Sequence, residues 1–206
     1  MHGRAGWGNG AMKLLLFGGT FDPPHNGHMR LLQSAIDAVQ PDKVMVMPAG
    51  VPPHKAASAT PASLRLTMCQ CFAPLHPDLV VSDWEIGRGG KNYTIDTVRM
   101  LEERYPGAEI FLSVGSDMLT TFTQWREWQS LLEKTTLVVQ SRYSGDGADL
   151  AAAARELEAA GGRVIFAHAP VLQAASSDVR AGKLGMDALP PLVQHICKQY
   201  HLYEKS

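Results

Sequence analysis

The chain has 206 residues, a formal net charge of −1 at pH 7 and 45% hydrophobic residues. This length suits one globular domain that can bury a full sheet. A near-neutral chain lacks the basic surplus that polyanions attract, so nucleic acid is not an expected partner. Three cysteines, Cys69, Cys71 and Cys197, form no zinc spacing and leave an odd number for disulfides. We therefore expect a cytoplasmic protein with reduced thiols.

The first residues differ in composition from the rest of the chain. Residues 1–12, MHGRAGWGNGAM, lack the apolar core of a signal peptide, and no apolar run is long enough to span a membrane. We expect a flexible extension at 1–12 and a single domain at 13–206. The sequence leaves the oligomeric state open and allows a homo-oligomer.

The segment from Lys13 to His28, KLLLFGGTFDPPHNGH, begins with a strand and a glycine turn. Its apolar run shows no alternation, which is typical of a central strand covered by helices on both faces. Gly18 and Gly19 then allow a tight turn and the close approach of a ligand.

A helix is predicted directly after this turn. Pro23 and Pro24 exclude helix before it, apolar residues recur at helical spacing over 28–39, and Asn26 is the expected N-cap. The helix N-terminus would present free N–H groups and a positive dipole end, which favour an anion. Since His25 and His28 can donate to phosphate oxygens, the stretch predicts a phosphate-binding turn.

Strands and helices alternate along the rest of the chain. Further strands are expected at 43–48, 79–86, 108–114, 135–140 and 163–168, and helices at 61–73, 94–105, 125–132, 148–160 and 192–197, with another helix starting at 176. This order predicts an α/β fold with a single Rossmann-like, doubly wound, mostly parallel sheet and helices on both faces. Ligands of such folds bind outside the carboxyl ends of the strands, where the polar candidates of this chain fall.

Five segments resemble known families. GGTFDPPHNGH resembles the signature of the nucleotidyltransferase superfamily, whose H-x-G-H histidines bind the triphosphate of ATP or CTP. The others resemble bacterial nicotinate mononucleotide adenylyltransferases: PPHK at 52–55, NYTIDT at 92–97, GSDML with F-x-x-W at 115–125, and SSDVR at 176–180. The chain departs from the family pattern at Ala175, where a hydroxyl is absent, and in a short connection at 181–190.

The resemblance implies two groups of site residues. ATP would contact Gly18, Gly19, Thr20, Phe21, His25, His28, Ser176, Ser177 and Arg180, of which His25, His28 and Arg180 would be catalytic. The mononucleotide would contact His54, Lys55, Tyr93, Thr94, Asp117 and Trp125. Asp117 would hold a ribose hydroxyl and Trp125 would stack on the pyridine ring, roles that suit a carboxylate and an exposed indole. Taken alone, Trp125 could be a core residue, and Thr94, Asp117, Ser176 and Ser177 could be helix caps.

The implied reaction is transfer of AMP from ATP to nicotinate mononucleotide, with Mg²⁺ held mainly by the ATP phosphates rather than by a metal site of the chain. ATP and the mononucleotide are then the expected partners. One alternative is phosphopantetheine adenylyltransferase, which shares the first and last motifs but is shorter and lacks the PPHK and YTIDT segments, or another adenylyltransferase. An alternative of a different class is a non-catalytic nucleotide-binding protein.

Overall fold

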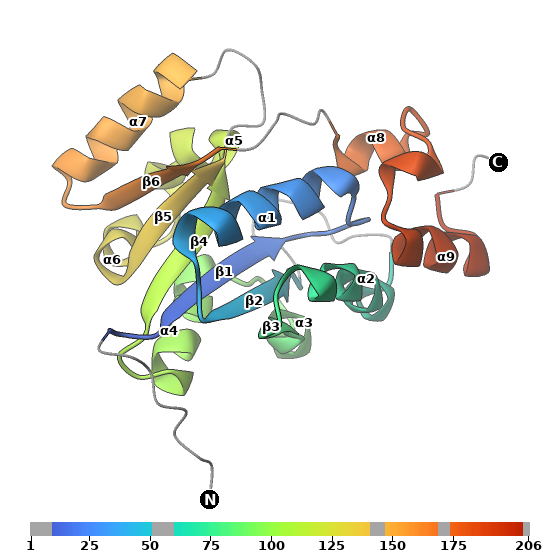
Figure 1. The fold of residues 1–206 in the computed structure, drawn as a ribbon, viewed down its shortest axis with the longest axis horizontal. Coiled ribbons are helices and arrows are strands. Elements are labelled where there is room, and N and C mark those ends of the chain that lie inside the picture. Colours follow the sequence, from blue (N-terminus) through green and yellow to red (C-terminus); the bar gives the residue numbers. More distant parts are fainter. Residues whose placement is uncertain (1–9, 51–59, 141–146, 169–173, 204–206) are drawn as a thin grey trace, which may run out of the picture.

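A six-stranded parallel sheet forms the centre of the computed structural model, which describes residues 10–50, 60–140, 147–168 and 174–203 (Figure 1). The strands are β1 (Lys13–Gly19), β2 (Lys43–Pro48), β3 (Leu79–Val81), β4 (Glu109–Gly115), β5 (Thr135–Gln140) and β6 (Arg163–Ala167). Their order is β3-β2-β1-β4-β5-β6, and every neighbouring pair is parallel. The predicted doubly wound fold is therefore confirmed, and the strand order reverses between β1 and β4, where open α/β sheets bind ligands.

Helices cover both faces of this sheet (Figure 1). They are α1 (Asn26–Val39), α2 (Ala62–Met68), α3 (Trp84–Arg88), α4 (Thr94–Arg104), α5 (Ser116–Thr120), α6 (Trp128–Lys134), α7 (Gly147–Ala159), α8 (Ser176–Arg180) and α9 (Pro191–Gln199), with 3₁₀ turns η1 (Cys69–Leu75), η2 (Phe122–Gln124) and η3 (Met186–Ala188). In the part of the chain that is described, no helix is both long and apolar enough to cross a membrane.

The sheet separates two hydrophobic cores. Successive side chains of β1 alternate between them, because a strand has a period of two. Leu15 and Phe17 join residues of α1, η1 and α9 in one core. Leu14 and Leu16 join residues of α4, α6 and α7 in the other. We refer to these as the α1 core and the α4 core.

Several predicted bounds differ from the structure, among them the helix expected at 61–73, whose α-helical part ends at Met68 before the 3₁₀ turn η1. The strand expected at 79–86 ends at Val81, and Trp84–Arg88 forms α3 instead. Ser82 ends the strand, since its hydroxyl accepts from the Trp84 N–H at 3.3 Å. The helix expected at 125–132 begins at Trp128. Next to the start of β1, the Met12 carbonyl accepts from the Glu109 N–H at 2.8 Å.

Leu101 tests the packing of the α4 core. This α4 side chain is fully buried there. We expect Leu101→Ala to lower the free energy of unfolding by about 2–5 kcal/mol, through lost burial and a residual cavity. Leu192→Ala in α9, where the side chain is 39% exposed, should change that free energy by about 0.5 kcal/mol or less. Urea denaturation of both variants measures the difference, and equal losses would contradict the described core.

Candidate active site

The glycine turn at the end of β1 is shaped by Phe21. A Cβ at Gly19 would lie 2.8 Å from the Phe21 ring, so only glycine fits there. Phe21 itself has a positive φ of 50°, and its ring is 2% exposed, with its centroid 5.4 Å from that of Phe72. The buried Phe21 side chain is therefore not accessible to ATP, and only the Phe21 backbone could bind it. Gly18, another predicted ATP-binding residue, is exposed.

His25 and His28 cap α1 reciprocally. The Nδ1 of His25 accepts from the His28 N–H, and the Nδ1 of His28 accepts from the His25 N–H, each at 3.3 Å. The N-cap is thus His25, and the prediction of Asn26 as the cap was wrong. Asn26 instead donates across the surface to the Asp187 carbonyl at 3.1 Å. The sequence missed this arrangement because capping boxes ordinarily use hydroxyl and carboxyl side chains.

The reciprocal cap determines the tautomer of both imidazole rings. A neutral imidazole that accepts at Nδ1 carries its proton on Nε2, so each ring is a hydrogen-bond donor at Nε2. The rings stack with centroids 3.7 Å apart. Gly27 makes this possible, since a Cβ there would lie 2.9 Å from the His25 ring. The motif H-x-G-H therefore holds two parallel donors at the start of α1.

Residues from the end of the chain are brought to the same loop. Ser176 donates from its hydroxyl to the Pro23 carbonyl at 2.8 Å. Arg180 Nη1 donates to the Asp22 carbonyl at 2.6 Å and lies 3.9 Å from the Asp22 carboxylate. Ser177 is exposed nearby in α8. The predicted grouping with His25 and His28 is thus present, but the cap of α8 is Ala175 and neither serine caps it.

Asp22 has a further partner that sequence reasoning missed. Tyr203 donates to the Asp22 carboxylate at 2.6 Å, and the Tyr203 and Thr60 oxygens lie 3.1 Å apart. Burial, together with the Asp22 carboxylate, raises the pKa of Tyr203 well above its ordinary value. No local pattern marks Tyr203, because its partner lies 181 residues earlier in the chain.

Four of the residues predicted to bind the mononucleotide, Tyr93, Thr94, Asp117 and Trp125, follow the carboxyl ends of β3 and β4. Tyr93 and Trp125 are half-buried and pack against the α4 core. Arg126 covers one face of the Tyr93 ring, with its guanidinium carbon 4.7 Å from the ring centroid. Thr94 is the first residue of α4, so its prediction as the helix cap was wrong; the N-cap is Tyr93, which makes no side-chain capping bond.

Asp117 follows β4 directly. It is exposed in the first turn of α5, beside the point where the strand order reverses. The resulting site thus spans the switch point, with the glycine turn on the β1 side and Asp117 on the β4 side. His54 and Lys55 lie outside the described residues.

A half-buried carboxyl lies beside the loop that follows β2. Glu85 accepts from the Thr97 hydroxyl at 2.6 Å, and its backbone carbonyl accepts from the Asn92 amide at 2.6 Å. The same carbonyl would be 2.5 Å from a Cβ at Gly50, so glycine is required there. Burial is the main cause that raises the pKa of Glu85 above its ordinary value.

The raised pKa of Glu85 predicts a pH-dependent stability. A carboxyl whose folded pKa exceeds its unfolded pKa favours folding below the unfolded value, and this contribution is lost as the pH rises through the folded value. Glu85→Gln keeps an acceptor for Thr97 but cannot ionise. We expect the variant to be more stable than the wild type at pH 7 and equal to it below pH 4.5, the ordinary pKa. Urea denaturation at both pH values measures this, and a variant that is less stable at pH 7 would contradict it.

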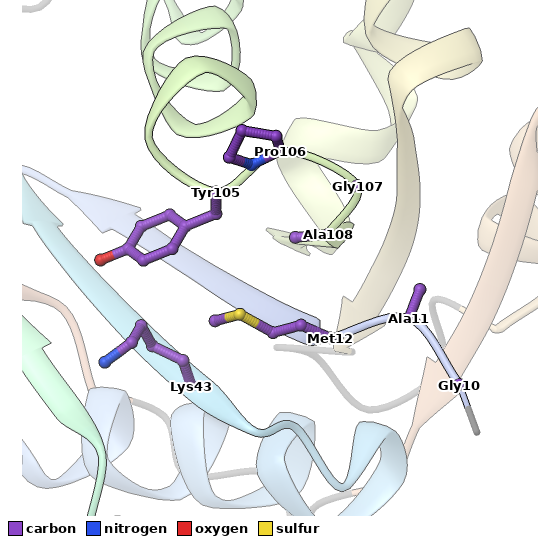
Figure 2. Close-up of a pocket in the computed structure, with 8 residues that line it drawn as sticks. All are labelled: Gly10, Ala11, Met12, Lys43, Tyr105, Pro106, Gly107 and Ala108. Atoms are coloured by element: carbon purple, nitrogen blue, oxygen red, sulfur yellow. The ribbon is translucent and has the colours of Figure 1, made fainter. Parts of the chain in front are cut away.

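Two pockets lie away from the glycine turn, and the described residues that line them include none of the predicted site residues. Figure 2 shows one of about 420 Å³, lined by Gly10, Ala11, Met12, Lys43 and residues 105–108. These residues lie at the amino ends of β1, β2 and β4, opposite the glycine turn. Another pocket of about 530 Å³ adjoins the outer side of the first turn of α1, where Asn26, Met29 and Arg30 line it.

Among the residues that the structure describes, no three His, Cys, Asp or Glu side chains lie close enough together to hold a metal ion.

The chain is similar in sequence to known proteins over most of its length. Residues 16–182 match the family model described as cytidylyltransferase-like. A probable nicotinate-nucleotide adenylyltransferase of Neisseria meningitidis serogroup C is 35% identical over 199 residues, covering 94% of this chain and 99% of the relative. One of Citrifermentans bemidjiense is 34% identical over 212 residues, covering 93% and 98%.

Solved structures share the fold. The Plasmodium falciparum nicotinic acid mononucleotide adenylyltransferase, solved in complexes with APC and with NaAD, superposes with a TM-score of 0.74 at 17% identity. Each superposition covers 93% of this chain and 97% of the other.

Proposed function

This chain belongs to the cytidylyltransferase-like family, and from that premise we propose that it transfers AMP from ATP to nicotinate mononucleotide, giving nicotinate adenine dinucleotide and pyrophosphate. The names of its relatives, which it matches over nearly their whole length, support this reaction. The P. falciparum structure in complex with NaAD supports nicotinate as the ring of the acceptor. The three cysteines are free and buried, which fits the cytoplasmic location that we propose.

The observation that carries this proposal is the convergence of donors on the β1–α1 loop. The reciprocal cap places two Nε2–H donors at the start of a 14-residue helix. Arg180, from α8, donates to the same loop at the Asp22 carbonyl. Helix N-terminus, imidazole donors and guanidinium all favour a polyanion. A triphosphate chain is the ligand that matches this set.

The nucleophile in this reaction needs no general base. A phosphate monoester has a second pKa near 6 and is mostly dianionic at neutral pH, so its oxygen can attack the α-phosphorus directly. This agrees with the predominance of hydrogen-bond donors among the described residues of the β1–α1 loop and α8. The residues of the chain have to align two anionic substrates in line, which removes part of the entropic barrier.

The remaining task is to stabilise charge on the leaving pyrophosphate. His25 and His28 would donate from Nε2 to its oxygens, and Arg180 would do so through its fork of N–H groups. The contacts of Arg180 to described residues all use Nη1, and its side chain is 44% exposed. We propose that Mg²⁺ binds with ATP through phosphate oxygens, where it supplies further charge neutralisation.

Pyrophosphate release tests the reaction. The purified chain with ATP and Mg²⁺ should release pyrophosphate with nicotinate mononucleotide, more slowly with the amide mononucleotide, and not at all with phosphopantetheine. Release with phosphopantetheine would favour that alternative acceptor. ATP binding without release for any acceptor would favour a non-catalytic nucleotide-binding protein.

The catalytic role of His28 can be separated from its capping role. In His28→Asn the amide oxygen can take the place of Nδ1 and keep the cap, whereas the Nε2 donor is lost. We expect kcat to fall by roughly 10²- to 10³-fold, the usual cost of one transition-state donor, with little change in Tm. Steady-state kinetics and thermal unfolding check this, with His28→Gln, which keeps a donor near Nε2, as the control. A folded His28→Asn protein with wild-type turnover would exclude the donor role.

Trp125 is expected to contact the pyridine ring. Trp125→Ala should weaken the binding of nicotinate mononucleotide by on the order of 1–3 kcal/mol, the contribution of a base stacked on an aromatic ring. The affinity for ATP should be unchanged. Trp128→Ala is the matched control, because Trp128 packs against the same core and is not expected to touch the substrate. Calorimetric titration of both ligands decides; if both variants lose affinity equally, Trp125 is a core residue only.

A further inference from the structure

Arg65 is a buried cation that the sequence did not single out. It lies in α2 and is 2% exposed. Arginine is rarely buried unless its charge is paired or its donors are satisfied. Burial is the main cause that lowers the pKa of Arg65, while the nearby charge of Asp22 acts in the opposite direction. Burial of the charged guanidinium therefore costs desolvation free energy, which hydrogen bonds from its donors must offset.

The guanidinium joins the loops that follow two neighbouring strands. Its Nη1 donates to the Thr20 carbonyl at 2.7 Å and to the Ala49 carbonyl at 2.9 Å, and its Nη2 reaches the Gly50 carbonyl at 3.5 Å. Thr20 follows β1, and Ala49 and Gly50 follow β2. A planar guanidinium can serve both loops at once, which a single ammonium group cannot do with the same geometry.

These contacts fix the direction of two peptide N–H groups. In a trans peptide the C=O of one residue and the N–H of the next point in opposite directions. With the Thr20 and Ala49 carbonyls turned inward to Arg65, the N–H groups of Phe21 and Gly50 point away from it. Neither N–H group has an acceptor among the described residues. Both residues stand at the carboxyl edge of the sheet, beside the glycine turn.

We propose that Arg65 is a positioning residue for the phosphate site, which orients the Phe21 and Gly50 N–H groups toward the bound triphosphate by holding the carbonyls behind them. This inference rests on the proposed function, in which the glycine turn binds ATP. Arg65 itself does not touch the ligand, because it is buried beneath the two loops.

The test compares two buried residues of the same helix. Arg65→Met removes the donors and keeps a long apolar side chain. Met68→Ala is the control: Met68 is also fully buried in α2, so its truncation lowers Tm without removing a hydrogen bond to either loop. We expect Arg65→Met to weaken the binding of ATP and of inorganic triphosphate. Its kcat/KM should fall by about 10- to 100-fold, the scale of a misplaced catalytic group. Met68→Ala should bind both as the wild type does, at a temperature below both Tm values.

Arg65→Lys keeps the inference testable if Arg65→Met fails to fold. One ammonium group cannot bridge both loops in the same way, so this variant should also bind inorganic triphosphate more weakly than the wild type, despite its unchanged charge. Wild-type affinity in a folded Arg65 variant, or an equal loss in Met68→Ala, would overturn the inference. If the wild type releases no pyrophosphate while Arg65→Lys still loses triphosphate affinity, the reaction is wrong and the positioning role holds.

Discussion

The structure depends on pairing the polar backbone of the loop between β1 and α1. This loop turns back over the sheet with Phe21, Asp22, Pro23 and His25 buried, so its carbonyls cannot rely on water and need partners from the protein. The partners come from distant parts of the chain: Arg65 for Thr20, Arg180 for Asp22 and Ser176 for Pro23. Arg180 and Ser176, predicted to hold phosphates, thus also stabilise the loop that would bind them.

The elements that could be predicted from the sequence are those with strong local signals. The bounds of β2 and β5 agree with the prediction, because short runs rich in β-branched and apolar residues without alternation are typical of central strands in a parallel sheet. β3 was predicted too long, since Leu79 to Ile86 is apolar enough for a strand and only the Ser82 hydroxyl, bonded to the Trp84 N–H, shows where the helix starts. A single side chain thus decided a boundary that hydrophobicity could not.

The candidate site could be predicted only in part. The H-x-G-H spacing located the two histidines, but their reciprocal cap requires both rings to stack, and stacking depends on Gly27 and on the aromatic neighbours Phe17 and Phe21. Arg65 and Tyr203 carry no motif, and their partners lie 45 and 181 residues away. Such contacts follow from the fold as a whole, which a pattern of nearby residues does not contain.

The division of the interior into two cores has a consequence for how this fold can change over evolutionary time. The phosphate turn is supported by the α1 core and its polar partners, whereas Tyr93 and Trp125 pack against the α4 core on the other side of the sheet. Substitutions in groups of residues that share no partners act almost independently. Substitutions around Tyr93 and Trp125 could therefore adapt the site to a different phosphate monoester while the phosphate turn stayed intact. The same fold could in this way serve reactions with several acceptor substrates.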